Sequence, residues 1–209
     1  MKNILLLSCF GALALAAGDT VTVSISTPSK GPVEVIVRNH GGEPVTAYAY
    51  TLKWAGGSRD EFEDSSMALD LRPVFPNAAE VRRPAGTGAN ATVVLRAALF
   101  ADGSSFGDPA WVARMVARRR YALEAVKASH GKLAAGVAAK TSRQTLAASF
   151  ASAAKSPAGK AEGDQQQVWK QHYERLADRL HKTTPEAALR DQELLEQKLA
   201  GALSNLAAN

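Results

Sequence analysis

The sequence Gly-Ser-Ser-Phe-Gly at positions 103–107 carries the most specific chemistry in this 209-residue chain. Its G-x-S-x-G pattern is that of the nucleophile elbow of α/β-hydrolases, in which Ser105 would be the nucleophile. That elbow needs a parallel sheet and a helix that begins at the serine, whereas Asp108-Pro109 predicts a helix start three residues later. Asp102 followed by Gly103 is also typical of a tight turn. We therefore expect no catalytic residue, and we keep a serine hydrolase using Ser105 as an alternative.

Residues that could hold a metal ion are few and unsuitably spaced. The four histidines include only one close pair, His172 and His181, and these are nine residues apart rather than the four that place two ligands on one helical face. The acidic run 60–64 has no glycine-spaced pattern of the kind found in calcium loops, so we expect it to be a solvated loop. The sequence predicts no metal and no cofactor.

A cluster of positive charge supplies the candidate binding residues. Segment 109–160 has ten basic residues against one acidic residue, a net charge of +9, whereas residues 17–108 and 161–209 carry −3 and −2. Such a cluster attracts anions, and an anionic envelope polymer or the acidic parts of the same chain would fit it. The alternative is that these basic residues have no ligand and simply form the solvated face of an amphipathic helix. We expect no nucleic acid as partner, because no recognition motif accompanies the charge. The candidate residues are Arg114, Arg118, Arg119, Arg120 and Lys127.

The N-terminus predicts export. Lys2 precedes a mostly apolar run from Ile4 to Leu15, and a small-x-small site follows, as in a secretory signal peptide cleaved near Ala16. The uncharged stretch has 16 residues, fewer than the ~20 that span a bilayer, so we expect no transmembrane anchor. A lipoprotein acylated at Cys9 is the alternative, but only eight residues precede Cys9. We expect a periplasmic or secreted protein that loses its one cysteine, and with it any disulfide.

The elements that must position these residues fall into two regions of an α+β fold. Residues 17–107 contain four strand patterns separated by turns: apolar and polar residues alternate at 20–26 and 33–38, and strand-forming residues are enriched at 45–54 and 92–100. These patterns predict an antiparallel immunoglobulin-like β-sandwich. The expected strands cover 20–26, 33–38, 45–54 and 92–100, with weaker candidates at 67–71 and 80–82.

The second region is helical. We expect a basic amphipathic helix over 108–130, an Ala-, Ser- and Lys-rich helix or linker over 131–163, and a helical tail over 164–209. Amphipathic helices need a cover for their apolar faces, and that cover is the sandwich, another helix of the chain, or a partner.

Two stretches resemble a group of uncharacterised exported bacterial proteins. Residues 33–52 are similar to the paired strands of immunoglobulin-like domains in that group, and residues 93–120 are similar to the end of such a domain with its helical extension. The resemblance implies a bacterial envelope setting and no assigned activity. The leading hypothesis is therefore an exported, non-enzymatic binding or assembly module of unknown specificity, with a protein partner or self-association through the helical tail.

Overall fold

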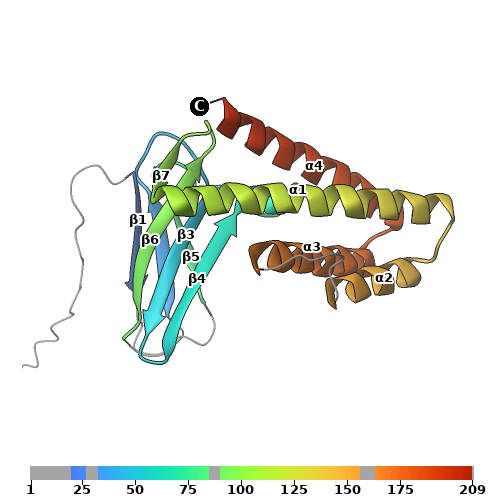
Figure 1. The fold of residues 1–209 in the computed structure, drawn as a ribbon, viewed down its shortest axis with the longest axis horizontal. Helices are drawn as coiled ribbons and strands as arrows, with labels where there is room; N and C mark the ends of the chain where they lie inside the picture. Colours follow the sequence, from blue (N-terminus) through green and yellow to red (C-terminus); the bar gives the residue numbers. More distant parts are fainter. Residues whose placement is uncertain (1–19, 27–32, 85–89, 156–162, 209) are drawn as a thin grey trace, which may run out of the picture.

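Two antiparallel β-sheets are followed by four helices in the computed structural model, which describes residues 20–26, 33–84, 90–155 and 163–208 (Figure 1). The predicted signal peptide and Cys9 lie outside the described residues. The elements are β1 (Val21–Ser26), β2 (Glu34–Asn39), β3 (Val45–Trp54), β4 (Gly57–Asp64), the short 3-10 helix η1 (Ser65–Met67), β5 (Ala79–Arg82), β6 (Thr92–Phe100), β7 (Ser105–Gly107), α1 (Pro109–Ala138), α2 (Arg143–Lys155), α3 (Gly163–Lys182) and α4 (Pro185–Ala207).

The sheets enclose a shared apolar core. One sheet has the strand order β1-β2-β5 and the other β4-β3-β6-β7, and all neighbours pair antiparallel. The alternation predicted from the sequence sends one face of each strand inward, as where Val37 of β2 lies opposite Val23 of β1. Val35, Val37 and Leu52 are completely buried in this core.

The outer face of the four-stranded sheet is covered by α1. Three alanines on this face, Ala47, Ala49 and Ala97, allow the helix to approach the strands. Met115 of α1 packs directly on them, with Trp111 one helical turn earlier beside it. The first helix is therefore part of the β region, and the basic residues that follow Met115 are held at the rim of the sheet.

Beyond the sheets, the helices pack on one another. Helix α1 projects past the strands, with α4 along one side of it and α3 and α2 along the other (Figure 1). Leu133, Phe150 and Leu180, from α1, α2 and α3, are completely buried together. Val126 of α1 and Leu199 of α4 belong to a second buried cluster. The apolar faces of the helices thus find their cover within the chain.

The structure confirms most predicted elements and corrects three. Segment 67–71 is not a strand: it ends η1 and continues as an irregular connection. The acidic run 60–64 is not a loop but belongs to β4, because its alternate residues, Phe62 among them, face α1. Helix α1 does not end near Gly131 but continues to Ala138, since the helix-forming residues around it outweigh the low helix propensity of glycine.

Among the described residues, no helix is long and apolar enough to cross a membrane.

The passage from sheet to helix depends on Gly107. Its φ is +102°, and a Cβ there would lie 2.3 Å from the carbonyl oxygen of Arg96. Asp108 follows as the N-cap of α1, accepting a hydrogen bond from the backbone N–H of Ala110 at 2.8 Å. Gly107 therefore sets the direction in which α1 leaves the sheet.

Replacing Gly107 by alanine is expected to lower the free energy of unfolding by about 2 kcal/mol, because strained backbone and a backbone clash act together. Urea denaturation measures this loss. Gly131→Ala is the matched control, since a Cβ at Gly131 meets no atom within 4 Å and alanine favours the helix. Equal stabilities for the two variants would contradict the assigned role of Gly107.

Candidate functional site: a groove at the end of a paired arginine row

Aromatic rings and guanidinium groups join α1 to the edge of the sheet. Phe62 of β4 stacks on Trp111 of α1, with ring centroids 5.6 Å apart. The guanidinium carbons of Arg114 and Arg118 lie 4.6 and 4.4 Å from the centroid of the Phe62 ring. Cations placed over a ring face are attracted by its negative face, so these arginines pack as well as carry charge.

Arg114 and Arg118 also form ion pairs with Asp164, at the beginning of α3. Arg114 contacts this carboxylate through Nε, and Nη1 of Arg118 lies 2.7 Å from Asp164 Oδ1. The side chain of Arg118 is only 5% exposed, and its burial lowers its pKa. Burial would raise the pKa of Asp164, but the hydrogen bond from Arg114 and the charge of Arg118 outweigh it and lower that pKa. The pairs fix the start of α3 against α1.

Arg119 is the most deeply buried of the five predicted residues. Its Nε lies 2.7 Å from Asp64 Oδ2, and its Nη2 donates to Thr46 Oγ1 at 2.8 Å. The side chains of Arg119 and Asp64 are 1% and 8% exposed. Asp64 also receives hydrogen bonds from the backbone N–H and the hydroxyl of Ser66, at the start of η1. This arginine therefore connects α1, β3 and β4 from inside.

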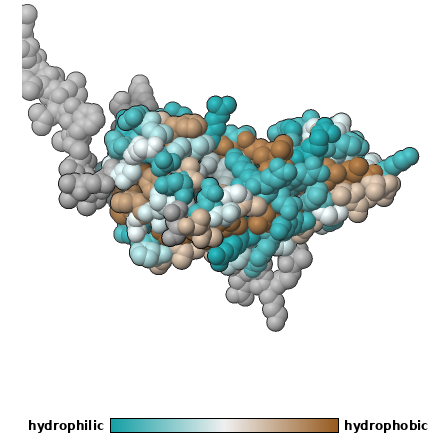
Figure 2. All heavy atoms as spheres, turned by 90° about the horizontal axis from the view of Figure 1, so that it is seen from above, coloured by the Kyte–Doolittle hydropathy of each residue, from teal (hydrophilic) through white to brown (hydrophobic). Residues whose placement is uncertain are grey.

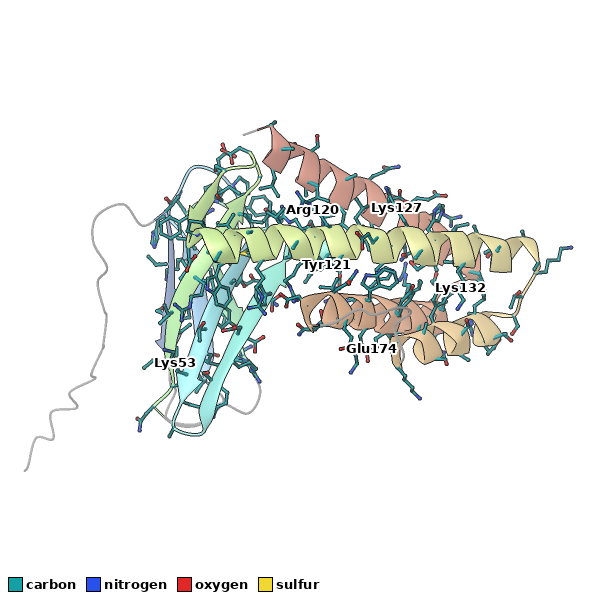
Figure 3. All side chains as sticks on the ribbon, viewed as in Figure 1. Lys53, Arg120, Tyr121, Lys127, Lys132 and Glu174 are labelled. Atoms are coloured by element: carbon teal, nitrogen blue, oxygen red, sulfur yellow. The ribbon has the colours of Figure 1, made fainter. Side chains whose placement is uncertain are left out.

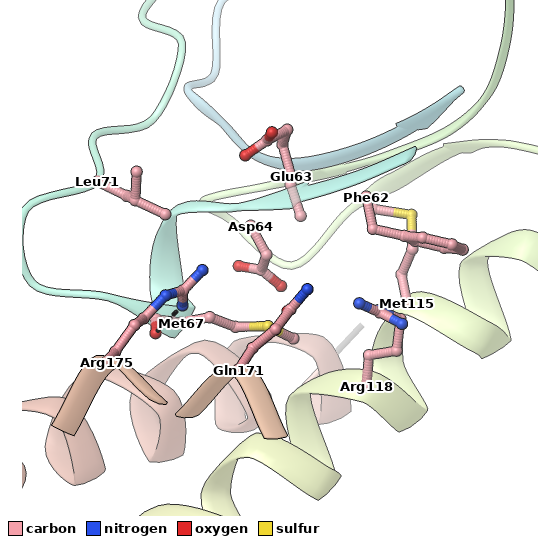
Figure 4. A pocket seen from close by; sticks show the side chains of 10 residues that line it. Phe62, Glu63, Asp64, Met67, Leu71, Met115, Arg118, Gln171 and Arg175 are labelled. Atoms are coloured by element: carbon pink, nitrogen blue, oxygen red, sulfur yellow. Dashed lines mark hydrogen bonds between the residues drawn. The ribbon is translucent and has the colours of Figure 1, made fainter. Parts of the chain in front are cut away.

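A small cavity of about 30 Å³ lies beside Asp64, between β4, α1 and α3 (Figure 4). Arg118 enters its lining from α1, and Gln171 and Arg175 enter from α3. Arg175 donates to the backbone carbonyl of Met67 at 3.2 Å. A cavity of this size has room for only a few water molecules, so it is too small for an organic ligand.

Arg120 and Lys127 differ from the other three predicted residues. Both side chains are exposed, and neither makes a hydrogen bond or an ion pair with any residue that the structure describes. They lie seven residues apart on the side of α1 that faces α4 (Figure 3). The structure thus divides the predicted set into three paired arginines and two cations that remain available to a partner.

Arg120 lies in a groove of about 450 Å³, formed where α1, the end of α4 and the β6–β7 turn meet. This volume is in the range of small-molecule sites. Among the described residues that line the groove, Arg120 alone is ionisable, and Ser105, from the G-x-S-x-G sequence, is also exposed there. The remaining lining residues are small, apolar or hydroxylated: Gly103, Ser104, Val112, Val116, Leu203, Leu206 and Ala207.

The sequence singled out Ser105 and Arg120 separately but did not predict that they share a site. The β6–β7 turn places the serines: Asp102 Oδ1 accepts from the backbone N–H and the hydroxyl of Ser104 at 2.9 and 2.7 Å. The tight turn expected at Asp102-Gly103 is therefore present, and Gly103 supports it with a φ of +90°. The far wall comes from the end of α4, a hundred residues later in the chain, and no local pattern indicates this meeting.

A buried serine–histidine contact is the other arrangement that the sequence did not predict. Ser129 Oγ of α1 lies 2.7 Å from His172 Nε2 of α3 and 2.9 Å from Gln192 of α4. Ser129 is completely buried, so a substrate has no access to its hydroxyl. The hydroxyl of Ser129 is a donor toward two acceptors, the backbone carbonyl of Val126 and the side-chain oxygen Oε1 of Gln192, and its oxygen can accept from the histidine. The cluster joins three helices.

No match was found for this chain among protein-family models, curated proteins or solved structures. In the part of the chain that the structure describes, no group of three or more His, Cys, Asp or Glu residues is placed to hold a metal ion. The groove must therefore be interpreted from its own residues.

Proposed function

We propose that this protein is an exported, non-enzymatic binding module that holds a small amphipathic molecule in the groove containing Arg120 and Ser105. The observation that carries the proposal is the combination, in one open groove, of apolar side chains from two helices with a cation that has no acidic partner among the described residues. Binding sites commonly combine apolar walls with a few convergent polar groups in this way.

The coverage of the helices supports binding over assembly. The tail residues Leu176, Leu195 and Leu199 are buried within the single chain, so most of the apolar surface that self-association would need is occupied. Seen from the α4 side, hydrophilic residues cover most of the surface and hydrophobic ones form separate patches between them (Figure 2). Stable oligomers bury larger, continuous apolar areas. Self-association through the helical tail therefore has less support.

The two other predicted activities also have less support. Ser105 belongs to the edge strand β7, and the described lining of its groove contains no histidine, carboxylate or lysine that could act as general base. An anionic envelope polymer would need a row of free cations, and three of the five candidates already pair with acids of the chain.

The envelope setting and the immunoglobulin-like sandwich form part of the proposal. Two facing antiparallel sheets with a common core are compatible with such a sandwich. We propose that a protein partner, where there is one, binds to the surface around the groove, and that the signal peptide delivers the module to the periplasm or the cell exterior.

The neutral dye Nile red tests the groove without presupposing a charged ligand. We expect saturable binding at one site per chain, and we expect Leu203→Trp, which fills the groove, to weaken it at least tenfold. Leu194→Trp is the control: it makes the same change at a leucine of α4 that is 54% exposed and lies outside the groove lining. Fluorescence titration measures both. Absence of binding, or equal binding to the Leu203→Trp variant, would contradict the proposed site.

A further inference from the structure

We infer that the ligand of this groove is an aliphatic carboxylate, bound with its carboxylate on Arg120 and its hydrocarbon chain between α1 and α4. The inference rests on the proposed function and names the ligand class for that same groove. It follows from the charge of Arg120, from the order of apolar and basic residues along α1, and from the apolar residues that α4 contributes to the groove.

The position of the ligand's head group follows from the exposure of Arg120, which differs in this from Arg118 and Arg119. Arg118 and Arg119 are buried and paired with Asp164 and Asp64, whereas Arg120 is exposed and has no acidic partner among the described residues. A guanidinium group binds a carboxylate through two parallel N–H···O hydrogen bonds. The described lining contains no carboxylate, so the carboxylate of a ligand would meet a guanidinium group that no described acid neutralises.

A hydroxyl group can assist the arginine. Ser104 is already engaged with Asp102, but the hydroxyl of Ser105 makes no hydrogen bond with any described residue. Ser105 and Arg120 line the same groove. A neutral hydroxyl can donate to a carboxylate, so this serine is suited to be a second donor and needs no general base to do so.

The tail position is defined by residue spacing on α1. Val112, Val116 and Arg120 follow one another at intervals of four, which places them in one row along the helix. The row has two apolar positions and then the cation, over a length of about 12 Å at 1.5 Å per residue. A ligand matching this row has an apolar tail and an anionic end.

The opposite wall of the groove, which α4 forms, is also apolar. Leu203 and Leu206 of α4 are three residues apart and thus share a face of their helix, and both line the groove. Leu206 also packs against the cluster that contains Met115, so this wall is attached to the core. Apart from Arg120 at one end, the two helical walls are apolar, which favours a plain hydrocarbon chain over a sugar or a peptide backbone, whose polar groups would lose hydrogen bonds there.

Isothermal titration of the mature chain with decanoate and with decanol tests the inference. The two probes share a chain and differ in the head group. We expect one decanoate per chain, bound at least tenfold more tightly than decanol, because a hydrogen bond to a charged group is the stronger contact. Octanoate should bind more weakly than decanoate, by about fourfold for each methylene removed.

Arg120→Gln should reduce decanoate affinity at least tenfold and leave decanol affinity unchanged. Lys127→Gln is the matched control, because it removes the same charge from an exposed position two turns further along α1, and it should bind decanoate as the wild type does. Thermal unfolding checks that both variants remain folded, as expected for exposed side chains.

Three results would overturn the inference. Equal affinity for decanoate and decanol, together with Nile red binding that Leu203→Trp weakens, would leave the groove as a binding site and reject the carboxylate. Equal decanoate binding by the Arg120→Gln variant and the wild type would reject the assigned head-group contact. Arg120-dependent binding to phosphatidylglycerol vesicles without decanoate binding would identify a membrane headgroup rather than a free acid.

Discussion

Replacing Arg119 by methionine is expected to lower the free energy of unfolding by about 3–5 kcal/mol, which is the typical cost of removing one partner of a buried ion pair. Methionine keeps most of the side-chain length but leaves the carboxylate of Asp64 without its cation in a site where that side chain is 8% exposed. It also removes the hydrogen bond to Thr46. Because Arg119 connects α1 with β3 and β4, the loss weakens the attachment of the helices to the sheet.

The next residue provides the control. Arg120→Met makes the same chemical change at an exposed arginine without a partner among the described residues, and we expect an effect within about 0.5 kcal/mol. The double variant Arg119→Met, Asp64→Asn should lose less than the sum of the two single variants, because it no longer contains a buried unpaired charge. Chemical denaturation of the wild type, the three single variants and the double variant measures these differences. A loss below 1 kcal/mol for Arg119→Met alone would show that the buried pair is not a structural contact.

Acidification is expected to destabilise the helical part through His172. Burial, with a contribution from the charge of Arg175, lowers the pKa of His172 from 6.5 to about 4, although a hydrogen bond with Gln192 partly opposes the shift. Between these two values the unfolded chain takes up a proton at this histidine and the folded chain does not. Stability therefore falls as the pH falls from about 6.5 to 4, by about 3 kcal/mol in total, and changes little through this group at lower pH.

Comparison with His172→Gln isolates that contribution from those of the carboxylates. Glutamine does not titrate, and its amide can still donate to Ser129, which lies 2.7 Å from the histidine nitrogen. Urea denaturation at a series of pH values from 7.5 to 4 should give a steeper loss of stability for the wild type than for the variant. Parallel pH dependences would show that His172 is not protonated preferentially in the unfolded chain.

Much of the fold is predictable because it depends on local patterns. Period-two alternation identified β1 and β2, enrichment in strand-forming residues identified β3 and β6, and Asp108-Pro109 identified the start of α1. Strand β4 was missed because its acidic residues resemble a solvated loop, and their partners lie elsewhere: Asp64 pairs with Arg119 of α1, and Asp60 accepts a hydrogen bond from Thr51 of β3. Local hydrophobicity does not contain that information.

For the candidate site too, some features follow from the sequence and others only from the tertiary structure. The sequence by itself determined the helix that carries the basic residues, the turn that presents Ser105, and the net charge of +9 over segment 109–160. Only the tertiary structure decided which of these charges are available. Asp164, which follows α1 in the chain, pairs with Arg118, and Asp64, which precedes α1, pairs with Arg119. The end of α4 forms the far wall of the groove around Arg120. Charge along a chain is a local property, but the pairing of charges and the shape of a groove depend on contacts between distant segments, and these are fixed only when the cores pack.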